Sequence, residues 1–147
     1  MKIAIASDHR GVAAKSKIKE FLEQSGYYVK DFGPASEDAV DYPDYAVKVA
    51  QAVSGGKVQR GILICGTGLG MCISANKIQG VRAATVHDIF TAEMSRRHND
   101  ANVLCMGEMI VNTEQMLEIV KVWLVTAFEG GRHQKRIDKI KKIEQTD

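Results

Sequence analysis

Apolar residues along this chain occur in short continuous runs, and each run is followed by a longer stretch of mixed apolar and polar positions. Short apolar runs are typical of strands buried on both faces of a parallel sheet. Apolar positions spaced three and four apart are typical of a helix that packs by one face. The runs predict strands at residues 3–6, 27–32, 61–64, 81–86 and 103–106.

The amphipathic stretches predict a helix after each strand. Gly26 and Asn99 are expected to close helices in the left-handed conformation, which glycine and asparagine adopt readily. Asn112 or Thr113 is expected to cap the start of a later helix with its side-chain oxygen. The expected helices cover residues 12–25, 42–54, 71–77, 89–98, 113–128 and 132–145.

Strands that alternate with helices predict a doubly wound α/β fold with a mostly parallel five-stranded sheet flanked by helices. No repeat or linker divides the chain, so residues 1–147 are expected to form one domain. The last helix lies beyond the final strand and is an addition to this fold. Its apolar residues Ile137, Ile140 and Ile143 recur every three positions, and two explanations stay open: packing against a second subunit or against the same domain.

Composition narrows the function classes. The chain has 147 residues, of which 45% are hydrophobic and 26% are charged, and its net charge is +2. That balance favours a soluble protein and gives no support for binding to nucleic acid or to a membrane surface. No window resembles a membrane span, and the N-terminus enters a strand directly, so we expect neither a membrane anchor nor a signal peptide.

The cysteines and histidines argue against a disulfide framework and a metal site. Cys65, Cys72 and Cys105 are odd in number and lack Cys-x-x-Cys spacing, which favours reduced thiols in a cytoplasmic protein. Cys72 and Cys105 have apolar neighbours and are expected to be small buried side chains. No two histidines show the His-x-x-x-His spacing typical of zinc ligands; they are His9, His87, His98 and His133.

The most informative segment is the glycine loop, residues 66–70, which follows the predicted strand 61–64. Glycines let the backbone approach a ligand closely, and free N–H groups there would bind an anion. Cys65 precedes the loop at the carboxyl end of the strand, where open α/β sheets bind ligands. The same N–H donors would stabilise a thiolate, which makes Cys65 a candidate base or nucleophile. The spacing fits neither the phosphate loop of nucleotide hydrolases nor the dinucleotide fingerprint.

Three further groups of residues are candidates for chemistry. Asp8 and His9 follow the first strand, at the expected ligand edge, although a turn aspartate is often only a cap. His98 ends a predicted helix, where it would also be favoured by the helix dipole. Arg132 and Arg136 share one helical face and could clamp a phosphate, although their spacing alone favours a solvated basic face, because several lysines share this helix.

Together these groups fit one reaction. A phosphorylated sugar needs cations for its phosphate, an acid–base pair to open its ring, a base to move a proton between adjacent carbons, and N–H donors for the enediolate oxyanion. The chain offers a candidate for each task. The sequence therefore favours an aldose–ketose isomerase that works on a phosphorylated sugar without a metal or another cofactor.

The sequence resembles ribose-5-phosphate isomerase of the B type, a family that also includes galactose-6-phosphate and allose-6-phosphate isomerases. The likeness covers nearly the whole chain and is carried by residues 7–11, 41–45, 64–70, 75–77, 95–104 and 129–133. It implies a Rossmann-like three-layer fold and a homodimer, paired into tetramers in some members, with active sites at the subunit interface. It also implies interconversion of ribose 5-phosphate and ribulose 5-phosphate in the pentose phosphate pathway.

The resemblance also implies roles for individual residues. Cys65 would take the C2 proton, and Thr67 with the backbone of the glycine loop would hold the oxyanion. Asp8 and His98 would serve ring binding and opening. The residues implied for substrate binding are His9, Gly66, Gly68, Leu69, Gly70, Asn99, Arg132 and Arg136.

Two positions depart from other members. Met71 stands where one branch carries a glutamate base, so this chain resembles the cysteine branch. Met109 stands where many members carry an arginine near the phosphate, so one cationic contact is missing there. Two alternatives remain beside the pentose enzyme: an isomerase of six-carbon sugar phosphates, and a non-catalytic nucleotide-binding module with Asp88 as its ribose acceptor.

Overall fold

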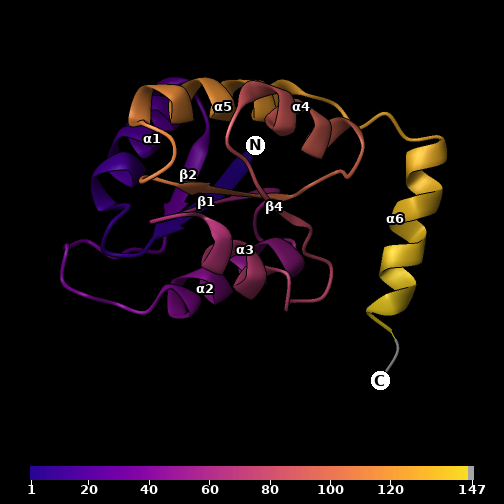
Figure 1. The fold of residues 1–147 in the computed structure, drawn as a ribbon, viewed down its shortest axis with the longest axis horizontal. Coiled ribbons are helices and arrows are strands. Elements are labelled where there is room, and N and C mark those ends of the chain that lie inside the picture. Colours follow the sequence, from indigo (N-terminus) through magenta and orange to yellow (C-terminus); the bar gives the residue numbers. More distant parts are fainter. Residues whose placement is uncertain (146–147) are drawn as a thin grey trace.

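The computed structural model describes residues 1–145 and consists of a five-stranded sheet between two layers of helices (Figure 1). The strands are β1 (Lys2–Ser7), β2 (Tyr28–Asp31), β3 (Arg60–Cys65), β4 (Ala83–Thr85) and β5 (Val103–Gly107). The helices are α1 (Val12–Gln24), α2 (Tyr42–Ser54), α3 (Leu69–Ala75), α4 (Ile89–Arg97), α5 (Thr113–Val125) and α6 (Arg132–Ile143).

The sheet has the strand order β2-β1-β3-β5-β4, and every neighbouring pair is parallel. Helices α1, α4 and α5 cover one face, and α2 and α3 cover the other (Figure 1). The expected doubly wound α/β fold with an added C-terminal helix is therefore confirmed.

The central strands are buried on both faces, which explains their continuous apolar runs. In β3, Ile62 and Ile64 pack with the helices of the α1–α5 side. Leu63 and Cys65 point the other way and pack with α2 and α3. Cys105 of β5 is fully buried on this second side, next to the same helices.

The boundaries of several elements differ from the expected ones. β4 is shorter than residues 81–86, because the N–H of Arg82 donates to the side chain of Asn102 at 2.7 Å, before the strand begins. The left-handed residue after α4 is Asp100, with φ 45°, and Asn99 does not take this role. α5 ends at Val125 rather than near residue 128, because the chain becomes extended at the next residue. The predicted cap by Asn112 is confirmed and forms a reciprocal capping box with Gln115.

Helix α6 stands away from the sheet at one end of the molecule (Figure 1). Its first turns contact the body through buried His133 and Ile137, and near its end Glu144 accepts the N–H of Gly80 at 3.1 Å. Between these two attachments a groove of about 420 Å³ separates the helix from the β4 side of the sheet. Ile140 lines this groove and stays 41% exposed. Among residues 1–145, no helix has the length and apolar content needed to cross a bilayer.

Candidate active site

The carboxyl ends of β1 and β3 bring the first group of predicted site residues together. The N–H of Asp8 donates to the carbonyl of Ile64 at 3.0 Å, so the turn after β1 lies directly beside the end of β3. Cys65 is the last residue of β3 and is 4% exposed. Asp8, His9, Cys65 and the glycine loop therefore share one edge of the sheet, as the sequence predicted.

The glycine loop folds back over the end of β5. A Cβ at Gly107 would lie 2.4 Å from the Cα of Thr67, so only glycine allows this passage. Gly68 has φ 81°, a conformation that side chains disfavour, and its N–H donates to the Sγ of Cys65 at 3.1 Å. The sulfur of Cys65 is therefore held against the backbone of the glycine loop.

The loop also offers backbone donors to a ligand. Among residues 1–145, the N–H groups of Gly66, Thr67 and Gly70 have no protein acceptor. Gly66 and Thr67 lie in the turn before α3, and Gly70 lies in the first turn of this helix of 7 residues. N–H groups without a protein acceptor, close in sequence to a cysteine sulfur, can donate to an oxygen that carries negative charge.

The turn after β1 holds two polar side chains in defined orientations. One carboxylate oxygen of Asp8 accepts the N–H groups of Arg10 and Gly11 at 2.9 and 3.3 Å, so Asp8 does cap its own turn. Its second oxygen has no protein partner among the described residues and is available to a ligand. The Nδ1 of His9 accepts the N–H of Val40 at 3.3 Å, which places the proton of a neutral ring on Nε2. His9 can therefore donate to an anion.

Three residues at this edge were not singled out from the sequence: Gly107, Tyr42 and Arg10. Gly107 lies under the loop, as described above. The ring of Tyr42 covers Gly70, where an added Cβ would lie 2.6 Å from it. Arg10 and Met109 meet over Gly66. Tyr42 belongs to a segment that carries the family resemblance, and this was the one signal available for it.

The other two cysteines behave differently from each other. Burial raises the pKa of Cys105, which is fully enclosed, as expected for a structural cysteine. Cys72 is only half-buried, and the thiol of Cys105 donates a hydrogen bond that, with smaller contributions from Thr85 and Asn76, lowers the pKa of Cys72 to about 6. The expectation of a small buried apolar side chain is therefore wrong for Cys72.

The second group of predicted residues lies at the opposite end of the sheet, where the strands begin. α4 follows β4 and runs back past the strands, so His98 at its C-terminal end is close to the starts of β4 and β5. Arg82, just before β4, donates to the carbonyl of Asn99 at 3.1 Å. β5 alone spans roughly 13 Å at the usual rise per residue. One chain therefore does not bring His98 near its own Cys65.

His98 belongs to a compact cluster with the start of α6. Its ring stacks on that of His133, with centroids 4.2 Å apart and planes 8° apart. One oxygen of Glu129 lies 3.3 Å from the Nε2 of His133 and 3.8 Å from that of His98, and Arg97 binds the other oxygen. Hydrogen bonding by Arg97 lowers the pKa of Glu129, so this carboxylate is ionised near neutral pH.

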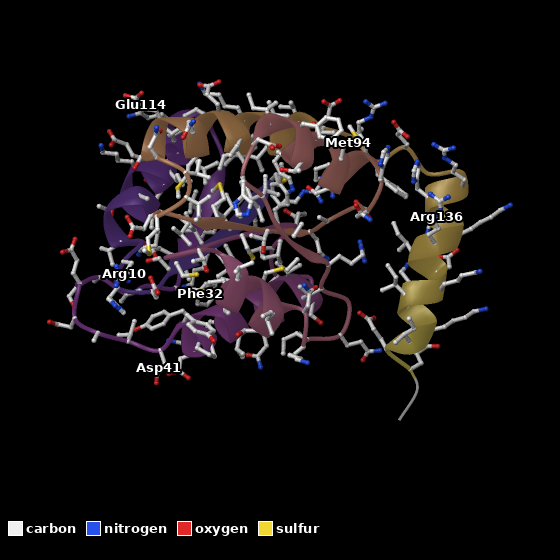
Figure 2. The ribbon with its side chains drawn as sticks, in the orientation of Figure 1. Arg10, Phe32, Asp41, Met94, Glu114 and Arg136 are labelled. Atoms are coloured by element: carbon white, nitrogen blue, oxygen red, sulfur yellow. The ribbon has the colours of Figure 1, made fainter. Side chains whose placement is uncertain are left out.

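Arg132 and Arg136 are on the same side of the molecule. The Nε of Arg132 donates to the Nε2 of His133 at 3.5 Å. Burial first, and then the neighbouring His98 and Arg132, lower the pKa of His133, which keeps this ring neutral near pH 7. Figure 2 shows Arg136 on α6, at the end of the molecule opposite to Arg10. The predicted phosphate-binding arginines thus accompany His98 and not Cys65.

This cluster also contains three potential metal ligands. His98, Glu129 and His133 offer ligand atoms within 4.8 Å of one another. A single ion cannot lie in the planes of two rings stacked in parallel, and Arg97 and Arg132 already place positive charge on the cluster. The ring stacking and the charge of the cluster therefore do not fit a metal site.

A separate hollow of about 900 Å³ lies between the start of α4 and α5, and its lining includes Phe90, Leu117 and Ile119. Its lining contains no cysteine, lysine or arginine, and its acidic side chains Asp88, Glu114 and Glu118 outnumber the one histidine, His87. Asp88 borders it, but the carboxylate accepts the N–H and hydroxyl of Thr91 and caps α4. Asp88, the residue that supported a nucleotide-binding module, therefore already uses its carboxylate to cap α4.

Comparison with known proteins agrees with this geometry. The sequence profile of the family described as Ribose/Galactose Isomerase matches residues 3–140. The chain belongs to this family. It is 48% identical over 144 residues to ribose-5-phosphate isomerase B of Escherichia coli, which covers 98% of this chain and 97% of that protein.

Solved structures of the family superpose closely on the fold. Ribose-5-phosphate isomerase B of Clostridium thermocellum has a TM-score of 0.97 at 52% identity, covering 99% of this chain and 98% of that one. The Mycoplasma genitalium enzyme with bound ribulose-5-phosphate has a TM-score of 0.96 at 45% identity, covering 99% and 97%. The family resemblance and the fold predicted from it are both confirmed.

The lowered pKa of Cys72 predicts its reactivity. Because the thiolate is the nucleophile, alkylation of Cys72 by iodoacetamide should reach half its maximal rate near pH 6, and Cys105 should remain unmodified in the folded protein. Peptide mapping by mass spectrometry across a pH series measures both rates, and the Cys72→Ser variant identifies the modified peptide. A half-maximal rate near pH 9, the ordinary value for a thiol, would contradict the assignment.

Proposed function

We propose that this chain is an aldose–ketose isomerase that interconverts ribose 5-phosphate and ribulose 5-phosphate through an enediolate. The observation that carries the proposal is the buried Cys65, which accepts an N–H at 3.1 Å beside a loop of unused backbone donors. Membership of the family and the names of its relatives support the same reaction.

The proposed mechanism uses only side chains and backbone groups. Cys65, as a thiolate, removes the proton from C2 of the aldose and returns it to C1 of the enediolate, while the proton of the C2 hydroxyl passes to the oxygen on C1. The N–H groups of the glycine loop, together with Thr67, stabilise the oxygen that gains charge. Asp8 and His98 hold and open the sugar ring. The phosphate is bound by His9, Arg132 and Arg136, and a sugar hydroxyl by Asn99; Gly66, Gly68, Leu69 and Gly70 form the wall beside Cys65.

We also propose that the protein is a homodimer in which each active site combines residues of both chains. The support is topological: Cys65 and Asp8 are at one edge of the sheet, whereas His98, Arg132 and Arg136 are at the other. Docking the α6 end of one copy on the glycine loop of the other would unite the two groups. The exposed apolar residues Leu69 and Ile73 of α3 and Ile140 of α6 provide contact area for this docking.

The proposal also covers the location of the protein, its domain organisation and its assembly. The free thiols of Cys65, Cys72 and Cys105 favour a cytoplasmic location, where thiols stay reduced. We treat residues 1–147 as a single isomerase domain, and pairing of dimers into tetramers stays a prediction. The six-carbon isomerases remain the second candidate function.

An assay with ribose, allose and galactose phosphates side by side tests the reaction. We expect ribose 5-phosphate to be the preferred substrate, and Cys65→Ala to lower its turnover by roughly 100- to 10,000-fold, the usual effect of removing an acid–base group. Ribose 5-phosphate should also raise the melting temperature, while a dinucleotide should not. Near-normal turnover by Cys65→Ala would exclude this thiol as the base.

Subunit mixing tests the shared site. Cys65→Ala and His98→Ala proteins should each be inactive. After subunit exchange, one site of each mixed dimer is intact, so about one quarter of the wild-type activity should return. Asp8→Ala is the matched control: mixed with Cys65→Ala it should restore nothing, because both residues come from the same chain. Failure of the first pair to regain activity, with exchange verified by native mass spectrometry, would contradict the shared site.

A further inference from the structure

The edge of the sheet that carries Cys65 has little positive charge of its own. The turns that follow β1, β3 and β5 comprise residues 8–11, 66–68 and 108–112, and Arg10 is the single lysine or arginine among them. Lys15, one helical turn farther on, is buried and bound to Asp31 and to the carbonyl of Pro34. Within the chain that supplies Cys65, Arg10 is therefore the arginine or lysine available in these turns to a phosphorylated substrate.

The turn after β1 holds the backbone of Arg10, and the side chain lies over Gly66. Its backbone N–H donates to Asp8 at 2.9 Å, inside the turn that holds the predicted ring-binding carboxylate. Its Cδ lies 3.3 Å from the place where a Cβ of Gly66 would be. Gly66 follows Cys65 directly, so the side chain passes over the glycine loop beside the proposed base.

The guanidinium of Arg10 is available for a ligand. Among the residues that the structure describes, it forms neither an ion pair nor a side-chain hydrogen bond, and the residue is exposed. This distinguishes it from Arg82, Arg96 and Arg97, which are all bound to carboxylates. A guanidinium presents several N–H donors in a plane and suits the oxygens of a phosphate.

Met109 approaches the same point from the other side. Its Sδ lies 3.1 Å from the Cβ position of Gly66, so Met109 and Arg10 converge over one glycine. A thioether brings no charge, so Arg10 is the charged one of the two side chains that lie over this glycine. A longer cationic side chain at position 109 would reach the space that Arg10 now occupies.

We propose that Arg10 contacts the substrate phosphate from the chain that supplies Cys65, opposite the partner's Arg132 and Arg136, and thereby sets the affinity for phosphorylated sugars. This inference rests on the proposed isomerase function and adds a residue to its site. In a pentose 5-phosphate only a few bonds separate C2 from the phosphate. An arginine rooted beside Cys65 can therefore reach the phosphate while the thiolate is at C2. Its bond to the phosphate is present before and after proton transfer, so it contributes to binding and not to the chemical step.

Steady-state kinetics of Arg10→Gln tests the proposal, since glutamine keeps much of the side chain and removes the charge. The KM for ribose 5-phosphate and the inhibition constant of inorganic phosphate should both rise about tenfold, as expected for one lost charge-assisted hydrogen bond. Turnover should stay within about threefold of the wild type. Lys17→Gln is the matched control, because Lys17 is exposed on α1 and this substitution removes the same charge at a distance from the site. The control substitution should change neither constant.

A second variant tests the placement of the charge. In Arg10→Gln/Met109→Arg, an arginine returns to the space over Gly66 from the other side, and the KM should recover most of the loss. An unchanged KM in Arg10→Gln, a fall in turnover without a change in KM, or a double variant without recovery would each overturn the proposal.

Calorimetric titration of inorganic phosphate separates this inference from the proposed function. If the wild-type protein isomerises none of the sugar phosphates, the proposed function fails on that result alone. The comparison of phosphate affinity between wild type and Arg10→Gln still decides the role of Arg10: a weaker affinity in the variant supports it, and an equal affinity overturns it.

Discussion

The parallel pairing of β3 with β5 is the constraint on which the rest of the candidate site depends. Its register places Cys65 opposite Gly107 at the end of the ladder. Because Gly107 has no side chain, the backbone of Thr67 can cross directly above it. That crossing turns the chain so that the N–H of Gly68 faces the sulfur of Cys65. Cys65 and the backbone donors are therefore positioned by the pairing of β3 with β5.

The same topology keeps the two halves of the site apart within one chain. A helix that connects parallel strands must run back along the sheet, so the end of α4 lies at the edge where strands begin. His98 is held there by its stack on His133 and by Glu129, which Arg97 anchors. No local rearrangement of a loop would carry this cluster past the length of β5. The proposed second copy would complete the site, and α6 stands away from the body at one end of the molecule (Figure 1).

Much of the fold could be predicted because its signals are local. Strands buried on both faces leave continuous apolar runs, and the cap at Asn112 follows from side-chain chemistry alone. Other features depend on contacts that a sequence does not display. Asp100 rather than Asn99 takes the left-handed conformation, in a place where Arg82 and Arg96 bind its carboxylate. The low pKa of Cys72 depends on a thiol that is distant in sequence.

The candidate site was predictable to a similar degree. Glycine spacing and strand ends placed Asp8, Cys65 and Thr67 at one edge, and the structure brings them together. Their chemical roles come from the family resemblance and stay predictions. Gly107 could not be singled out, because its importance arises from a chain crossing that only the folded backbone reveals. The separation of His98 from Cys65 did have a signal in the alternation of strands and helices, since it follows from the direction of each helix.

The most direct test of the shared active site is a crystal structure of the Cys65→Ala protein with ribulose 5-phosphate bound. We predict a dimer in which C2 of the sugar lies above position 65 of one subunit, with its oxygen facing the N–H groups of the glycine loop. The phosphate should contact Arg132 and Arg136 of the other subunit. A sugar phosphate bound away from position 65, or bound by residues of a single chain alone, would contradict the account.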